Sequence, residues 1–312
     1  MQLYRTIDIP KQAKNCILAI GNFDGVHRGH QAVIQEAKSI ALKENKKLGI
    51  LTFEPHPQSF FEKNRNNFRL TPFRIKFELI KKLNVDLYFN IRFNNSFSKT
   101  SAEKFIMEML VKKMQISHII TGFDFVFGSK QKGDVNLIKK LAKQTNLFEF
   151  RSVEDFKAND IKKLSSSVVR TKLLSGDLQK VSEILGRDWS LKARVIKGES
   201  RGQKIGFPTI NLNIEKYSSI CFGVYAVDVI LNLNYKSKKL IFKGIANYGV
   251  KPTFPSLKPL LEVNIFDFND NIYGELVEIR FKSFIRKEKK FDSIESLKKQ
   301  ISEDVNFVKE YF

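Results

Sequence analysis

The sequence has 312 residues, 42% of them hydrophobic, which excludes a disordered chain and predicts two domains, since single cores rarely grow to this size. Its net charge of +21 comes from lysines spread along predicted helices, as on ordinary solvated surfaces, so we expect no nucleic-acid partner. Two distant cysteines, Cys16 and Cys221, exclude a disulfide framework, and no signal or transmembrane run is expected, which predicts a cytoplasmic protein without a membrane partner.

Residues 16 to 153 alternate short apolar runs with amphipathic helical patterns. The runs predicted to be strands are Cys16–Ile20, Leu48–Phe53, Val85–Ile91, His118–Thr121 and Phe148–Val153. Thr71 is expected to cap a helix whose first turn holds Pro72, and Thr100–Glu103 has the form of a capping box for a second helix. Such alternation predicts an α/β fold with a parallel sheet, whose ligands bind beyond the carboxyl ends of the strands.

The segment Gly21–His30, with the sequence GNFDGVHRGH, lies between the first predicted strand and a predicted helix. Glycines at such a turn let backbone amides approach a phosphate, and the helix N-terminus adds partial positive charge. His27 and His30 are three residues apart, so both imidazoles face one side and can stabilise a phosphate in a transition state. A chance pairing and a metal site are the alternatives, although a metal usually needs a third ligand.

After residue 186 the pattern changes to runs separated by Asn-, Gly- and Pro-containing turns. The runs predicted to be strands are Val224–Leu231, Leu240–Ala246, Leu260–Phe268 and Leu276–Phe281, separated by turns at Asn232–Asn234, Asn247–Pro255 and Asn269–Asn271. This pattern predicts a small antiparallel barrel. An amphipathic helix from about Asp292 is expected to plug or cover it. The predicted domains are residues 1–185 and 186–312.

A second candidate site precedes these strands. Pro208 fixes the backbone so that Thr209 and Asn211, two apart on an extended segment, point to the same face. A hydroxyl and an amide oxygen are hard ligands that suit Mg²⁺ carried with a nucleotide. Backbone amides of the preceding loop can wrap phosphates around three glycines, Gly198, Gly202 and Gly206. A surface hairpin loop is the alternative for this stretch taken alone.

Several motifs occur in the order found in one family. They are Gly21–His30, Thr52–Pro57, Gly122–Gly128, Ser165–Arg170, Lys197–Asn211, Ala246–Phe254, Leu261–Phe268, Tyr273–Gly274 and Phe284–Glu288. Over essentially its whole length the chain resembles the bacterial bifunctional riboflavin kinase/FMN adenylyltransferases (FAD synthetases). The resemblance implies a Rossmann-like nucleotidyltransferase domain followed by a riboflavin kinase barrel.

The resemblance also implies substrates and cofactors. Riboflavin and ATP would give FMN in the C-terminal domain, and FMN and ATP would give FAD and pyrophosphate in the N-terminal domain, with Mg²⁺ serving both reactions. A chain that retains one activity, or a basic nucleic-acid-binding protein with an ATP site, is the alternative. Whether the chain forms a homo-oligomer is left open.

For the N-terminal domain, the resemblance implies catalytic roles for His27 and His30. It implies an ATP site that contains Gly21, Phe23, Asp24, Asp124, Ser165, Ser166, Ser167 and Arg170. The arginine suits this role because its planar fork binds phosphate oxygens in pairs. The implied flavin pocket is bordered by Pro55, His56 and Pro57, with a simple turn role as the alternative for His56. Arg28 departs from the family's usual leucine.

For the C-terminal domain, Glu262 is the implied general base, which takes the proton from the ribityl 5′-hydroxyl as that oxygen attacks the γ-phosphate. A solvent-facing strand residue is the alternative. Arg286 is implied to lie on a second flap near the flavin. Two departures, Ile210 for alanine and Asn264 for a frequent histidine, are not expected to abolish activity.

Overall fold

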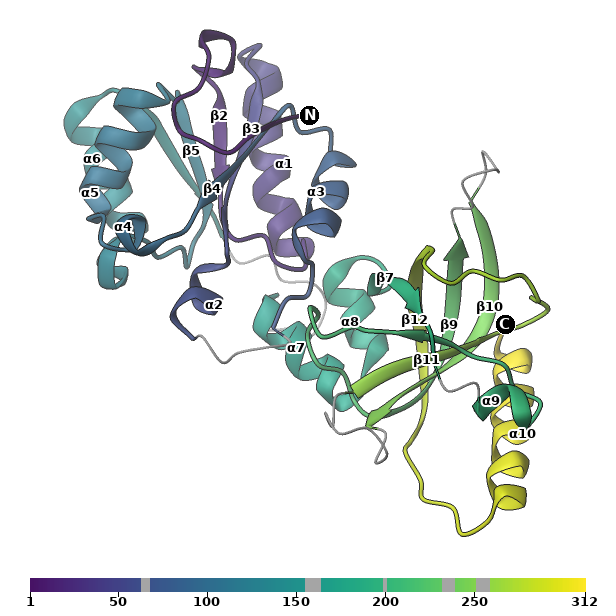
Figure 1. The fold of residues 1–312 in the computed structure, drawn as a ribbon. Coiled ribbons are helices and arrows are strands. Elements are labelled where there is room, and N and C mark those ends of the chain that lie inside the picture. Colours follow the sequence, from purple (N-terminus) through teal and green to yellow (C-terminus); the bar gives the residue numbers. More distant parts are fainter. Residues whose placement is uncertain (63–67, 155–163, 199–200, 232–238, 251–258) are drawn as a thin grey trace. The chain divides into compact units, whose positions relative to one another are not determined.

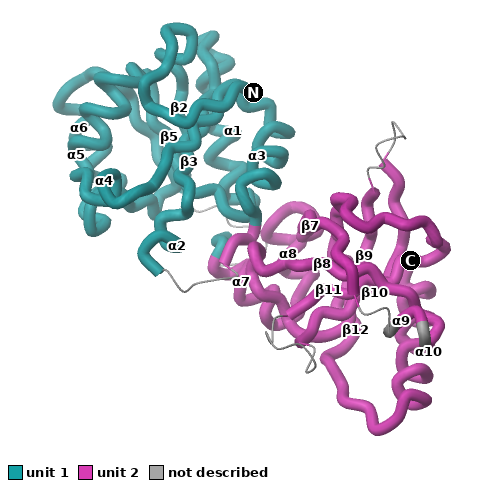
Figure 2. Tube along the Cα trace, in the orientation of Figure 1, with its two compact units in different colours: residues 1–66, 71–166 teal, residues 67–70, 167–312 magenta. Residues whose placement is uncertain are grey.

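The computed structural model describes residues 1–62, 68–154, 164–198, 201–231, 239–250 and 259–312, without the side chains of Arg201 and Lys204. The chain divides into two compact units (Figure 2). Unit 1 holds Met1–Asn66 and Thr71–Ser166, and unit 2 holds Asn67–Leu70 and Ser167–Phe312. The predicted turn at Asn232–Asn234 and residues 251–255 of another lie outside the described residues.

Unit 1 is built on a six-stranded sheet in the order β1-β4-β3-β2-β5-β6 (Figure 1). Its strands are β1 (Gln2–Tyr4), β2 (Ile17–Ile20), β3 (Leu48–Glu54), β4 (Leu87–Arg92), β5 (His118–Gly122) and β6 (Glu149–Val153). All neighbouring pairs are parallel, so the predicted parallel sheet is confirmed. The edge strand β1 was not predicted, because three mostly exposed residues give no apolar run.

Helices cover both faces of this sheet, as its strands require. The helices of unit 1 are α1 (Arg28–Lys43), α2 (Pro57–Phe61), α3 (Phe73–Lys81), α4 (Asn95–Ser98), α5 (Ala102–Lys104), the π-helix η2 (Phe105–Lys113) and α6 (Val135–Thr145), with 3-10 turns η1 (Lys11–Ala13) and η3 (Ser129–Gln131). Ile17 and Ala19 of β2 pack with α1 and α3, whereas Leu18 and Ile20 pack with η2 and α6. Successive residues of a buried strand thus supply two cores.

Two predicted helix caps are wrong in detail. Ser101, not Thr100, caps α5, since its Oγ accepts a hydrogen bond from the Lys104 amide. Pro72 itself is the N-cap of α3, and the hydroxyl of Thr71 accepts a hydrogen bond from the amide of Gly25 instead. Thr71 is therefore committed to the loop that follows β2.

Unit 2 contains a closed barrel in the order β10-β11-β8-β7-β12-β9, and all its described pairs are antiparallel, so the predicted barrel is confirmed. Its strands are β7 (Ser190–Ile196), β8 (Ile210–Leu212), β9 (Gly223–Leu231), β10 (Leu240–Val250), β11 (Pro259–Ile265) and β12 (Leu276–Lys287). Its helices are α7 (Ser166–Ser175), α8 (Leu178–Leu185), α9 (Arg201–Lys204) and α10 (Ile294–Tyr311). By contacts α8 and almost all of α7 group with the barrel, so this compact unit begins before residue 186.

The terminal helix α10 covers the outside of the barrel (Figure 1). Val308, which is fully buried, and Val305 pack against Val224 and Ile245 of the barrel wall. Of the two expected arrangements, a plug or a cover, the structure has the cover. Within the described residues, no helix has both the length and the apolar character needed to span a bilayer.

Two candidate active sites

The loop between β2 and α1 has an unusual backbone. Phe23 and Val26 have φ angles of 49° and 43°, in the left-handed region that bulky residues rarely adopt. Each such residue costs about 1–3 kcal/mol and persists only where the surrounding structure holds it. Gly25, which lies between them, also has a positive φ of 84°, but glycine adopts this conformation without strain.

The carboxylate of Asp24 helps to hold this loop. It is 1% exposed and accepts hydrogen bonds from the amide and hydroxyl of Thr71, at 2.9 and 3.2 Å. The backbone carbonyl of Asp24 accepts a hydrogen bond of 2.7 Å from the hydroxyl of Ser166. Asp24 and Ser166, both expected at the ATP site, therefore brace the loop itself.

His27 and His30 lie together at the start of α1, on one side as their spacing predicts. Their rings stack with centroids 3.6 Å apart and planes 21° from parallel. His27 is the N-cap of α1, and its Nδ1 accepts a hydrogen bond from the His30 amide at 3.3 Å, which leaves Nε2 as the protonated nitrogen in the neutral ring. A Cβ on Gly29 would lie 3.2 Å from the His27 ring, so a larger residue would crowd it.

The other expected ATP-site residues are distributed between the two units. Ser165 lies in unit 1, and Asp124 is exposed in the turn after β5 of that unit. Ser167 and Arg170 belong to α7 of unit 2. There the guanidinium of Arg170 lies 3.8 Å from the ring centroid of Phe68 and donates a hydrogen bond to the Phe68 carbonyl.

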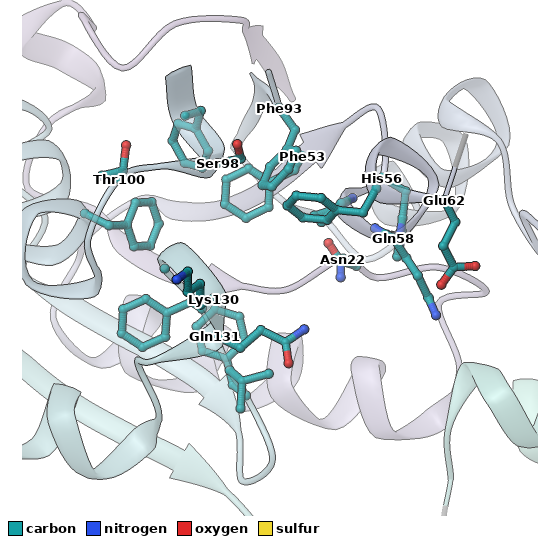
Figure 3. A pocket seen from close by; sticks show the side chains of 18 residues that line it. Asn22, Phe53, His56, Gln58, Glu62, Phe93, Ser98, Thr100, Lys130 and Gln131 are labelled. Carbon is teal, nitrogen blue, oxygen red and sulfur yellow. Dashed lines mark hydrogen bonds between the residues drawn. The ribbon is translucent and has the colours of Figure 1, made fainter. Parts of the chain in front are cut away.

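An aromatic cavity of about 650 Å³ opens beside the sheet of unit 1 (Figure 3). Seven rings from six different elements or loops line it, those of Phe53, Phe61, Phe93, Phe97, Phe105, Phe125 and Phe127. Polar side chains around them include Asn22, Gln58, Thr100, Lys130 and Gln131. An apolar cavity of this size with a few polar groups is typical of a small-molecule site and suits a flat aromatic ring.

Two of the three residues expected at the flavin pocket line this cavity. They are His56 and Pro57, whereas Pro55 is not among the lining residues. His56 is also the N-cap of α2, where its Nδ1 accepts a hydrogen bond from the Gln58 amide at 3.2 Å. The turn role and the cavity role proposed for His56 thus coexist.

In unit 2, three polar residues stand opposite one another across neighbouring strands. Glu262 of β11 pairs with Asn211 of β8 on one side and with Asn247 of β10 on the other. Directly opposed residues of an antiparallel sheet project from the same face. Leu261 and Val263 point the other way and are fully buried, so Glu262 faces the outer side covered by α10.

Asn211 has the environment expected of a ligand. The side chain is 5% exposed, and its Oδ1 accepts no hydrogen bond from the described part of the chain. Buried amide oxygens normally have a partner. A Cβ on Gly198 would lie 2.1 Å from the Asn211 Nδ2, so only glycine fits above this amide.

Thr209 stands between two cavities. A cavity of about 670 Å³ between the barrel and α10 is lined by Glu262 and Thr209, together with apolar residues Ile205, Phe207, Leu297 and Ile301. A second cavity of about 400 Å³ is lined by Thr209 again, with polar residues that include Gln203, Asn269, Asp270 and Asn271. Thr209 is therefore in contact with both cavities.

Arg286 lines the larger cavity and is fixed by α10. Its Nε donates to Asp304 Oδ1 at 2.9 Å, and its Nη2 donates to Asp304 Oδ2 at 2.6 Å. Such a two-pronged pair holds the guanidinium in a defined plane. Glu288 also lines this cavity, and burial raises the pKa of its carboxyl group, an effect that the charge of Arg286 opposes.

Comparisons with known proteins match both units. A family model described as FAD synthetase covers residues 9–168, and one described as riboflavin kinase covers residues 185–312. The bifunctional riboflavin kinase/FMN adenylyltransferase of Buchnera aphidicola from Schizaphis graminum is 39% identical over 100% of this chain and 99% of its own. The chain belongs to this family of bifunctional enzymes.

Two further comparisons also extend over nearly the whole chain. The family member from Bacillus subtilis is 36% identical over 97% of this chain and 94% of its own. A crystal structure from Streptococcus pneumoniae, described as a macrolide-efflux protein, has a TM-score of 0.84 and 27% identity over 99% of this chain and 98% of its own. That likeness extends over both units.

Two departures from the family pattern have structural explanations. Asn264 donates a hydrogen bond of 2.6 Å to the carbonyl of Pro208, and so supports the segment that carries Thr209 and Asn211. Ile210 lines the smaller cavity, in which Asn211 takes no part. Arg28, the first residue of α1, is exposed, and nothing in the structure explains the departure there.

Sequence reasoning missed several residues of the two sites. The phenylalanines of the first cavity come from separated segments, and no local pattern marks them as neighbours. Asn247 and Asp304 are equally ordinary in sequence, and their roles depend on strand register and on the docking of α10. These residues can be recognised only from the tertiary structure.

Proposed function

We propose that residues 186–312 transfer the γ-phosphoryl group of ATP to riboflavin, which gives FMN. We propose that residues 1–185 then adenylate FMN with a second ATP, which gives FAD and pyrophosphate. Family membership supports the two activities, and the separate cavities of the two units support a separate site for each. The free cysteines fit a reducing, cytoplasmic setting.

For the kinase reaction, the larger cavity of unit 2 suits the flavin and the smaller one suits the nucleotide. The apolar walls of the larger cavity can hold the isoalloxazine ring while the ribityl chain extends toward Glu262. Glu262 then accepts the proton of the 5′-hydroxyl as that oxygen attacks the γ-phosphorus. The placement of Thr209 on the wall of both cavities carries this assignment, since the phosphoryl group must pass from one to the other.

The residues present fit Mg²⁺ carried with the nucleotide. Asn211 Oδ1 is a buried oxygen that accepts no hydrogen bond from the described residues, and Thr209 supplies a hydroxyl two residues away. Hard oxygen donors of this kind suit a cation that keeps waters and phosphate oxygens in its shell. Bound there, the ion supplies positive charge to the phosphates.

For the adenylyl transfer, the aromatic cavity of unit 1 suits the flavin ring of FMN. A phosphate oxygen of FMN attacks the α-phosphorus of ATP, the bond to the β-phosphate breaks, and pyrophosphate leaves. His27 and His30 donate hydrogen bonds to the phosphate oxygens as negative charge grows on them. The N-terminus of α1 adds its partial positive charge at the same place.

Product analysis tests the proposal directly. Purified chain incubated with riboflavin, ATP and Mg²⁺ should yield FMN first and FAD second, separated by chromatography and detected by flavin fluorescence. Supplied FMN should yield FAD without riboflavin. If neither flavin is converted, while the chain shows a salt-dependent shift on DNA or RNA, the nucleic-acid-binding alternative replaces this proposal.

A further inference from the structure

Lys76 of α3 is a buried cation close to the first candidate site. Its side chain is 0% exposed, although lysine is almost never fully buried without partners. The Nζ atom donates a hydrogen bond of 3.1 Å to the backbone carbonyl of Asn22 and lies 4.0 Å from Oε2 of Glu54. Both partners belong to segments that border the aromatic cavity or lead directly into it.

The contact with Asn22 acts on the strained loop. Asn22 immediately precedes Phe23, the first residue of that loop with a positive φ. Further along the loop, the carbonyls of Asp24 and Val26 also accept hydrogen bonds from side chains. Lys76 thus completes a set of side-chain donors that holds the loop by its carbonyl groups.

Asn22 also connects the loop to the flavin cavity. Its side chain lines the aromatic cavity, where Figure 3 shows it near His56 and Gln58. The loop that starts at Asn22 ends at His27, the cap of α1. A donor that fixes the Asn22 carbonyl therefore fixes the spacing between the cavity and the paired imidazoles.

The second contact of Lys76, with Glu54, acts on the turn that follows β3. Glu54 is the last residue of β3, and Pro55 alone separates it from His56, which caps α2 and lines the cavity. The ammonium group of Lys76 therefore contacts both the loop between β2 and α1 and the turn that leads to α2. A buried charge is not required for packing, since apolar residues of similar volume often replace such groups without loss of stability.

We infer that Lys76 is a positioning residue for adenylyl transfer. It holds the loop and the turn at a fixed separation, so that the phosphate of FMN, bound in the aromatic cavity, meets the ATP held near His27 and His30. The inference rests on the function proposed for unit 1. It assigns the cation no contact with either substrate.

The test replaces the cation and keeps its volume. In the full-length chain, Lys76→Met should lower kcat/KM for FAD formation from supplied FMN about 100-fold, because small misplacements of reacting groups have effects of this size. We expect kcat to fall and the KM for FMN to rise. Lys76→Arg, which keeps the charge and the donors, should retain more activity than Lys76→Met. Lys81→Met, an exposed lysine of the same helix, is the matched control.

Riboflavin phosphorylation by the same samples reports on the fold of the rest of the chain, and thermal unfolding reports on unit 1. The inference requires unchanged phosphorylation and an unfolding temperature close to that of the unsubstituted chain. Wild-type FAD formation by Lys76→Met overturns it. The inference is also overturned if both Lys76 variants lose FAD formation to the same extent and unit 1 unfolds in both, since the role of Lys76 is then structural. If the unsubstituted chain makes no FAD, the proposed function fails instead.

Discussion

Asn211 of β8 and Glu262 of β11 are directly paired on neighbouring strands of the barrel, so they share one face. The Oδ1 of Asn211 accepts no hydrogen bond from the described residues. Glu262 and Thr209 both line the larger cavity of unit 2. This combination separates two tasks, because oxygen ligands can hold the nucleotide's cation while the carboxylate handles the proton of the acceptor. The two roles can therefore be tested separately by single substitutions.

Glu262→Gln should stop FMN formation and spare FAD formation from supplied FMN. The amide keeps the shape of the side chain but cannot accept the proton, and a positioned base contributes about 10²- to 10⁴-fold. The measurement is kcat for each half-reaction on the same sample. Glu310→Gln, an exposed residue of α10, should change neither. Normal phosphorylation by Glu262→Gln would mean that another group is the base.

His30→Ala should have the reverse effect. It removes one of the two stacked imidazoles from the start of α1 and should lower FAD formation about 10²- to 10³-fold, as loss of one donor to a charged transition state does. Riboflavin phosphorylation should stay at its original rate, measured by FMN accumulation. Equal loss of both reactions would show that the residue supports folding and would contradict the assigned role.

The sequence predicts the fold where local patterns are strong. It predicts candidate site residues where they belong to short motifs. The pairing of His27 with His30 follows from their spacing on a helix start, whereas the common face of Thr209 and Asn211 stays a prediction from strand geometry. Asp304 could not be found this way. Its partner Arg286 is 18 residues away, and the contact exists only because α10 docks on the barrel. Register and docking are tertiary properties that no single segment encodes.

Asp304→Asn should weaken riboflavin binding and destabilise unit 2. The substitution leaves a largely buried guanidinium without its charged partner, which costs roughly 3 kcal/mol. Arg286 loses its fixed orientation in the cavity, so the KM for riboflavin should rise more than kcat falls. Thermal unfolding and steady-state phosphorylation give the two numbers, with the exposed Asp292→Asn as control. An unchanged KM would separate Arg286 from flavin binding.

Phe61→Ala should raise the KM for FMN without loss of stability. The ring lines the aromatic cavity but is 65% exposed, so its removal leaves no buried void. Loss of one stacking partner costs about 1 kcal/mol, which corresponds to roughly a fivefold higher KM. Leu147→Ala, at a site that is 61% exposed and outside the cavity, is the control. An unchanged KM for FMN, measured with saturating ATP, would place the flavin ring elsewhere.

The two cysteines should differ sharply in reactivity. Burial raises the pKa of the Cys16 thiol from 9.0 to about 12, an effect that a backbone hydrogen bond partly opposes. Cys221 is only partly buried. Since the thiolate is the reactive form, a thiol reagent at pH 8 should label one cysteine of the native chain and two of the denatured chain. Native Cys16 keeps its proton where the unfolded chain loses it, so its contribution to the unfolding free energy decreases as pH rises from 9 toward 12. Rapid labelling of both thiols at pH 8 would show that Cys16, the residue before β2, becomes exposed to solvent.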